Sequence, residues 1–146
     1  MLRVLLLALL LLTSCSHKRA EIYINAELQP YVDSFLIHGV NLGRPVYISS
    51  LIADFGYTAE DDAGTCYDDP VLPIITIDKL YWETLNPSAK EILMYHELGH
   101  CVLGRGHNLT LDDTQAPVSI MYKSLFSYKH YETNRLLFLT ELFHGG

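Results

Sequence analysis

The stretch that decides the fold is HELGHCVLGRGH, residues 96–107. His96 and His100 are four residues apart, so on a helix they lie about 40° from each other around the axis and about one turn apart along it. Both rings can therefore reach one metal ion, and Glu97 can act as general base on water at that ion. The spacing predicts a zinc site for hydrolysis.

A catalytic zinc ion usually has three protein ligands, and His107 is the candidate for the third. On a straight helix His107 would lie roughly 10 Å beyond His100, whereas zinc ligands lie about 2 Å from the ion. The chain must therefore turn back. Gly104 suits the left-handed residue that ends many helices, and Gly106 gives a second permissive position before His107.

A helix start precedes the motif. Asn86 is a typical N-cap residue, Pro87 is a typical first helical residue, and apolar residues follow at 92–94. We expect a helix of about 17 residues that ends at Gly104.

The segment resembles the zinc signature of the metzincin metallopeptidases, most closely the matrixin-like branch, with its pattern HExxHxxGxxH and a later Met-turn. Gly104 and His107 each come one residue later than in that pattern, so the motif here is HExxH-x6-H. The resemblance covers roughly residues 74–146. It implies an α+β fold with a twisted sheet, an N-terminal helix, the zinc helix, a Met-turn and a C-terminal helix. It also implies a zinc-dependent endopeptidase that binds one Zn²⁺ ion and cleaves peptides or proteins.

Residues 119–122 are Ser-Ile-Met-Tyr, which is similar to the Met-turn of that family. The resemblance places Met121 beneath the zinc ligands as an apolar floor, and the alternative is an ordinary core methionine. Some metzincins have a tyrosine ligand two residues after this methionine. That position is Lys123 here, so we do not expect Tyr122 to bind the metal.

Two other interpretations stay open. In a gluzincin the third ligand is a glutamate on a later helix, and Glu132 and Glu141 are candidates because residues 131–143 have a helical pattern. Alternatively, the displaced His107 fills or distorts the open coordination position. The chain would then be a noncatalytic zinc-binding or interaction lipoprotein on a metzincin-like scaffold.

The N-terminus resembles a bacterial lipoprotein signal. An apolar run over residues 4–12, too short to span a bilayer, ends in Leu-Thr-Ser-Cys at Cys15. The resemblance implies a signal peptide over 1–14, a lipidated Cys15 with a tether over 15–20, and one peptidase domain over 21–146. Ser16 after the cysteine implies the outer membrane of a bacterial envelope. The alternative is an ordinary signal peptide with an incidental cysteine.

Composition limits the partners. The formal net charge of -7 argues against nucleic acid, and the length suits one compact domain, which we expect to be a monomer. Besides Cys15, the chain has Cys66 and Cys101, and we expect a disulfide between them, as in exported proteins. Cys101 could instead be a fourth metal ligand, but it follows His100 directly and points about 100° away around the helix.

The other expected elements are a helix over 22–38, in which Pro30 indicates a start or a kink, a strand over 44–48, an acidic loop over 60–69 and a strand over 71–78. The loop is expected to be solvated, with a calcium site as the alternative. The resemblance implies that the 71–78 strand is the sheet edge bordering the cleft, and Pro73 fits an edge strand better than a central one. By the resemblance, an extended substrate would pair with that edge.

Overall fold

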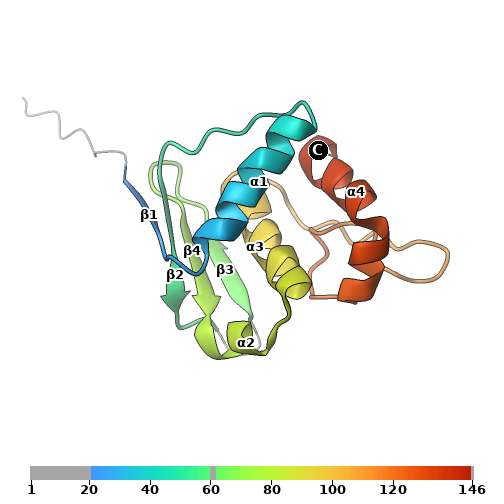
Figure 1. Ribbon diagram of the computed structural model, residues 1–146. Helices are drawn as coiled ribbons and strands as arrows, with labels where there is room; N and C mark the ends of the chain where they lie inside the picture. The colour runs from blue at the N-terminus through green and yellow to red at the C-terminus, as the bar shows by residue number, and fades with distance from the viewer. Residues whose placement is uncertain (1–20, 60–61, 146) are drawn as a thin grey trace, which may run out of the picture.

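The computed structural model describes residues 21–59 and 62–145, which form a mixed α+β fold with one four-stranded twisted sheet and four helices (Figure 1). The predicted fold class is confirmed. The elements in chain order are β1 (Ile22–Ile24), α1 (Gln29–Asn41), β2 (Leu51–Gly56), β3 (Gly64–Tyr67), β4 (Ile74–Asp78), α2 (Lys79–Thr84), α3 (Pro87–Cys101) and α4 (Tyr128–His144). No helix in this described part of the chain has the length and apolar character needed to cross a membrane.

The sheet has the strand order β1-β2-β4-β3. Strands β1, β2 and β4 are parallel, and β3 is antiparallel to β4, with Cys66 opposite Ile75. A parallel pair needs a crossover connection, and α1 with the segment after it provides the crossover from β1 to β2. Because β3 is the last strand in the order, it forms an edge of the sheet, and this edge lies beside α3 (Figure 1).

The core lies between the sheet and the helices. Helix α3 contacts β3 and β4 on one side and both α1 and α4 on the other (Figure 1). The Phe35 ring of α1 packs edge-on against Tyr95 of α3, with ring centres 5.2 Å apart, and lies 4.9 Å from the ring of Phe143 in α4. All three rings are buried, and burying such a side chain contributes roughly 2 to 3 kcal/mol. The helix that carries the metal motif is thus held from several sides.

Two predictions for the N-terminal half were wrong. Residues 22–24 form a strand and not the first turns of a helix. The helix begins at Gln29 with Pro30 in its first turn, as the start signal at Pro30 indicated. Residues 44–48 form no strand, and the strand of this region is Leu51–Gly56. The reason is strand pairing. Strand β2 is hydrogen-bonded to β1 on one side and to β4 on the other, whereas none of the described strands pairs with residues 44–48, which connect α1 to β2.

The sheet edge was also predicted wrongly. The 71–78 strand begins at Ile74, after Pro73, and is central rather than at the edge. The predicted acidic loop contains β3, which takes the edge position instead. Residues 60 and 61, on which the calcium alternative partly depends, lie outside the described residues.

The helix signals around the motif were correct. Asn86 caps α3, its side-chain Oδ1 accepting a hydrogen bond from the Ala89 N–H at 3.0 Å, and Pro87 is the first helical residue. The helix has 15 residues and ends at Cys101, slightly earlier than predicted. The predicted C-terminal helix is α4, which has non-helical backbone angles at Asn134.

Candidate metal centre and catalytic cleft

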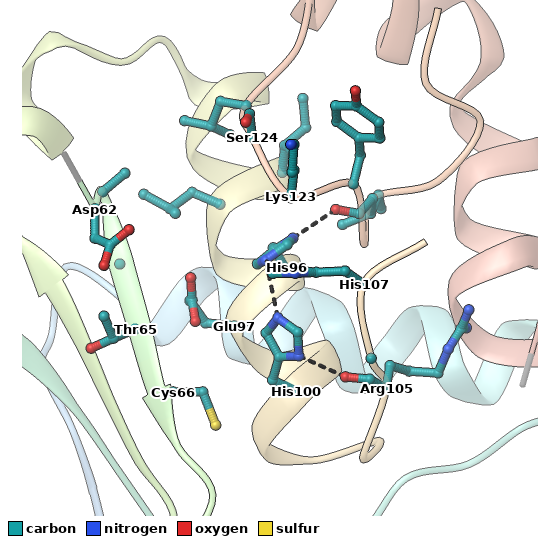
Figure 2. A pocket seen from close by; sticks show the side chains of 18 of the residues that line it. Asp62, Thr65, Cys66, His96, Glu97, His100, Arg105, His107, Lys123 and Ser124 are labelled. Carbon is teal, nitrogen blue, oxygen red and sulfur yellow. Dashed lines mark hydrogen bonds between the residues drawn. The ribbon is translucent and has the colours of Figure 1, made fainter. Parts of the chain in front are cut away.

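The three predicted histidine ligands meet. One ring nitrogen from each of His96, His100 and His107 lies within 4.8 Å of the others (Figure 2). The Nε2 atom of His96 is 3.1 Å from that of His100 and 3.3 Å from that of His107. Tetrahedral zinc with Zn–N bonds of about 2.0 to 2.1 Å separates two ligand nitrogens by about 3.3 Å. The spacing of the nitrogens therefore fits one tetrahedral metal ion.

Backbone carbonyls orient two of the rings. Nδ1 of His96 donates to the Ile120 carbonyl oxygen at 2.9 Å, and Nδ1 of His100 donates to the Arg105 carbonyl oxygen at 2.6 Å. A carbonyl oxygen can only accept, so both Nδ1 atoms carry the proton and both Nε2 atoms present lone pairs. This is the tautomer that a metal ion requires.

Burial also favours the neutral histidines. Burial, aided by the neighbouring His100 and His107 and opposed by the hydrogen bond to Ile120, lowers the pKa of His96 to about 4. The pKa of His107 is lowered by burial, by His100 and by Lys123. The cluster is therefore ready to coordinate a cation near neutral pH.

The extra residue of the motif is taken up in the last turn of α3. The Leu103 N–H bonds to the Leu98 carbonyl at 3.2 Å, and the Arg105 N–H bonds to the Gly99 carbonyl at 2.8 Å. In the common Schellman ending the outer hydrogen bond joins residues five apart, whereas the bond from Arg105 joins residues six apart. Gly104 has a φ of +64°, as predicted for the turn. The widened turn still returns His107 to the other two histidines.

Met121 packs against α3 at Gly99, which lies between His96 and His100 in the sequence. It is fully buried in a turn that the Tyr122 N–H closes with a 3.2 Å bond to the Ser119 carbonyl. A Cβ atom added at Gly99 would lie 2.3 Å from the Met121 sulfur. Only glycine at this position lets the methionine lie so close to α3.

Glu97 lies in the cleft beside the histidines (Figure 2). Its side chain is buried, and this burial together with the nearby Asp62 carboxylate raises the carboxyl pKa to about 7. Across the cleft, a Cβ atom added at Gly64 of β3 would lie 3.1 Å from Glu97 Oε1. Sequence reasoning missed Gly64. The available signal was a glycine close to a strand, which often marks a close approach of another group.

A cleft of about 720 Å³ passes over the histidine cluster. Residues 64–66 of β3 line one wall, and residues 122–125, after the Met121 turn, line the other (Figure 2). The edge strand that borders the cleft is thus β3 and not the 71–78 strand.

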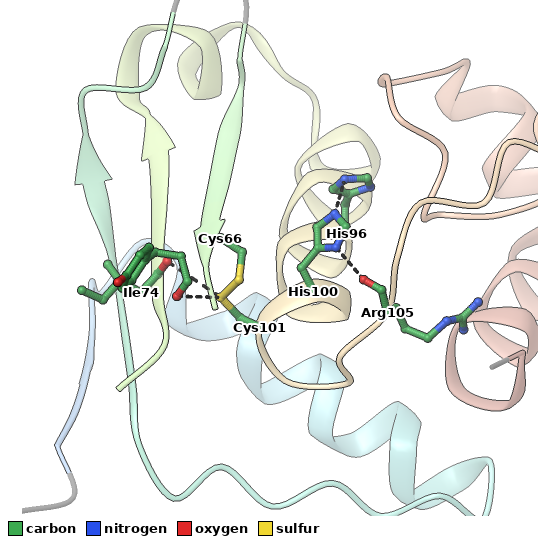
Figure 3. Close-up of a disulfide and its surroundings, with 7 residues drawn as sticks. Cys66, Ile74, His96, His100, Cys101 and Arg105 are labelled. Carbon is green, nitrogen blue, oxygen red and sulfur yellow. Dashed lines mark hydrogen bonds between the residues drawn. A yellow bond between two sulfur atoms is a disulfide. The ribbon is translucent and has the colours of Figure 1, made fainter. Parts of the chain in front are cut away.

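The predicted disulfide between Cys66 and Cys101 is confirmed, with sulfurs 2.00 Å apart (Figure 3). It joins β3 to the last residue of α3. Since its sulfur is bonded to Cys66, Cys101 is not a fourth metal ligand. Cys15, the predicted lipidation site, lies outside the described residues.

Neither glutamate of the gluzincin alternative joins the cluster. Glu132 accepts a hydrogen bond from the Ser88 hydroxyl at 2.5 Å. The Glu141 carboxylate is held by Arg105 and Ser119, at 2.6 and 2.5 Å. Within the described ranges, the one group of three or more potential ligand residues is the histidine cluster with His107.

Residues 56–123, just under half of the chain, match a family model described as "Putative phage metallopeptidase". The matched segment contains β3, β4, α3, His107 and Met121. No curated protein and no solved structure matches the chain. Together, the family match and the histidine cluster support a metallopeptidase in the broad sense.

Proposed function

We propose that this chain is a zinc-dependent endopeptidase of metzincin type. The observation that carries the proposal is the cluster of His96, His100 and His107 beside the Glu97 carboxyl group in an open cleft. The Nε2 atoms of His100 and His107 lie 3.1 and 3.3 Å from that of His96, and all three ligand atoms lie within 4.8 Å of one another. Three neutral imidazoles form a donor set that suits zinc and leaves one coordination position open. A bound zinc ion would polarise a peptide carbonyl group and favour the ionisation of water.

Glu97 would transfer the proton. Its pKa of about 7 lets the carboxylate take a proton from the attacking water near neutral pH and pass it to the leaving amine. The buried position beside Gly64 keeps the carboxylate at the cleft and limits its rotamers. The protein residues thus supply a metal site and a general base in one groove.

The exposed edge of β3 would bind the substrate. Strand β3 pairs with β4 on one side only, so its other edge offers backbone donors and acceptors toward the cleft. An extended peptide can add to such an edge by main-chain hydrogen bonds. This arrangement favours cleavage within an extended chain.

The anchoring part of the proposal rests on the sequence. It assigns lipidation to Cys15, a tether to residues 15–20, and the catalytic domain to the outer membrane of a bacterial envelope. Metabolic labelling with a fatty-acid analogue should mark the wild-type protein, and Cys15→Ser should remove the label. A labelled Cys15→Ser protein would refute the anchor.

The noncatalytic alternative rested on the displacement of His107. The widened turn supports catalysis instead, because it brings His107 Nε2 to 3.3 Å from His96 Nε2, a distance that needs no distortion of a tetrahedral site.

The test compares purified wild-type protein with Glu97→Ala. Metal analysis should find about one zinc ion per chain in both. Mass spectrometry of a mixed peptide library should find cleavage only with the wild type. Glu132→Ala, which changes an exposed glutamate outside the cleft, should behave like the wild type. Zinc in both proteins without cleavage would instead support the noncatalytic alternative, and full cleavage by Glu97→Ala would refute the general-base role.

A further inference from the structure

The carboxylate of Glu141 on α4 is a point where three separate donors meet. Its Oε1 atom accepts from the Arg105 guanidinium at 2.6 Å and from the Asn108 side-chain amide at 3.1 Å. Its Oε2 atom accepts from the Ser119 hydroxyl at 2.5 Å. The ion pair is largely shielded from water, because the Arg105 and Glu141 side chains are only 14% and 21% exposed. Hydrogen bonds to charged groups in such places are stronger than neutral ones.

The donors come from two segments that hold the histidines: Arg105 and Asn108 flank His107, and Ser119 lies in the turn that contains Met121. The Arg105 carbonyl accepts the Nδ1 proton of His100, and the Arg105 guanidinium also donates to the carbonyls of Glu141 and Leu142. His107 lies between Arg105 and Asn108, so both of its flanks are fixed by Glu141 Oε1.

The second segment is the Met121 turn. The Ser119 hydroxyl donates to Glu141 and accepts from the Met121 N–H at 3.0 Å, so the hydroxyl holds the turn from inside. Between these two residues lies Ile120, whose carbonyl oxygen accepts the Nδ1 proton of His96. The Asn108 N–H bonds to the Met121 carbonyl at 2.9 Å and joins the two segments.

We propose that Glu141 is a positioning residue of the metal centre, since its one carboxylate fixes the segment that orients His96 and the segment that orients His100 and carries His107. This inference rests on the proposed zinc-binding function. The loop that carries His107 contains Gly104 and Gly106, and glycines lose more conformational entropy on ordering than other residues. Without an external hold, metal binding itself would have to order the loop. Changes in groups that orient metal ligands typically weaken metal affinity by about 10- to 100-fold.

The main test uses Glu141→Gln, which keeps the shape of the side chain but removes its charge. An amide nitrogen replaces one acceptor oxygen. Ser119 loses its partner if the nitrogen takes the Oε2 position, and Arg105 and Asn108 both lose theirs if it takes the Oε1 position. We measure the zinc dissociation constant of the purified full chain by competition with a chromophoric chelator. We expect it to rise by about 10- to 100-fold in the variant. The visible spectrum of the cobalt-substituted protein should also change, because it reports the geometry of the ligands.

Two further variants make the test specific. Ser119→Ala removes the bond to Oε2 and the acceptor of the Met121 N–H but keeps the bonds of Glu141 to Arg105 and Asn108, so it should weaken zinc binding less than Glu141→Gln does. It carries the test if Glu141→Gln fails to fold. Glu132→Gln changes another glutamate of α4, one that bonds Ser88 away from the cluster, and should leave both the zinc affinity and the cobalt spectrum as in the wild type. Melting temperatures of the metal-free proteins are recorded in parallel, because a merely structural role would lower these without changing zinc affinity at 25 °C.

Weaker zinc binding and an altered cobalt spectrum in the Glu141 or Ser119 variant, but not in Glu132→Gln, would support the proposal. Zinc affinities within twofold of the wild type in both variants would overturn it, while a wild type that binds zinc would leave the proposed function standing. A wild type that binds no zinc would overturn the metal site and, with it, the role of Glu141.

Discussion

Removal of the disulfide between Cys66 and Cys101 should cost the domain much of its stability. The two cysteines are 35 residues apart in sequence. In the chain-entropy model, closing a loop of that length in the unfolded state stabilises the folded state by about 4 kcal/mol. With an unfolding entropy of ~2.1 cal/mol/K per residue, that loss lowers the melting temperature of a domain of this length by about 15 °C.

The variant Cys66→Ala/Cys101→Ala tests this prediction. Alanine is used in place of serine because residue 101 is only 8% exposed, and a serine there would bury a hydroxyl group. Thermal unfolding is followed by circular dichroism with a chelator present, so that bound metal does not contribute. Wild-type protein in reductant should melt at the temperature of the double variant. The double variant itself should not respond to reductant. A drop below about 4 °C, or roughly 1 kcal/mol, would refute the reasoning and show that the link does not constrain the unfolded chain.

Three further predictions concern helix α3 and the cleft. Gly64→Ala should lower peptidase turnover by about 10-fold with zinc content unchanged, because the new methyl group would lie 2.9 Å from Ile77 Cδ1 and 3.1 Å from Glu97 Oε1, so that the Glu97 carboxylate is displaced; metal analysis beside steady-state kinetics checks this. Gly99→Ala should destabilise the wild type, because the added Cβ would lie 2.3 Å from the Met121 sulfur; overpacking of this kind costs about 1 to 3 kcal/mol, of which the better helix propensity of alanine returns ~1 kcal/mol. In a Met121→Ala background the overlap is gone, so Gly99→Ala should stabilise the protein. A double-mutant cycle of denaturant melts measures this coupling. In the metal-free protein, the Glu97 pKa of about 7, raised from 4.5, means that the native state keeps a proton that the unfolded state has lost, so this residue makes stability fall as pH rises through that window. The His96 pKa of about 4, lowered from 6.5, acts in the opposite direction, because the unfolded state binds the proton that the native state has lost. The two effects offset each other between pH 4.5 and 6.5, so metal-free Glu97→Gln should gain stability with rising pH there more steeply than the wild type, as urea melts across that range will test.

Helix α3, which carries His96 and His100, could be predicted from the sequence because the signals for it are local. Asn86 and Pro87 begin the helix within one turn, and the spacing of His96 and His100 follows from helix geometry alone. The glycine at 104 marks the turn for the same reason: its positive φ is a property of the backbone at that residue. The disulfide required only that two cysteines be left in a chain whose N-terminus resembles an export signal.

The strands were poorly predicted because their stability comes from partners far away in sequence. Residues 44–48 contain Val46 and Ile48 and have the composition of a strand, yet they pair with nothing. Leu51–Gly56 contains alanine, aspartate and glycine, which disfavour strands, but it lies between β1 and β4 with hydrogen bonds on both sides. Strand propensity mainly reflects such surroundings, which one sequence does not show. The edge position of β3 was missed for the same reason.

Glu141 shows the same limit at the site itself. In the sequence it is one of two glutamates in a helical pattern, and only the tertiary fold separates them: Glu132 meets Ser88, while Glu141 lies against both segments that orient the histidines. The family match ends at residue 123, before α4 begins, so it does not include Glu141 either. The longer motif and the Glu141 contacts address one physical problem. An extra residue between His100 and His107 gives the loop more conformations to lose, and the ion pair of Arg105 with Glu141 removes them before any metal ion binds. If this is correct, the penalty of Glu141→Gln lies in the ordering of the loop, so it should appear in the zinc dissociation constant even at temperatures where both proteins are fully folded.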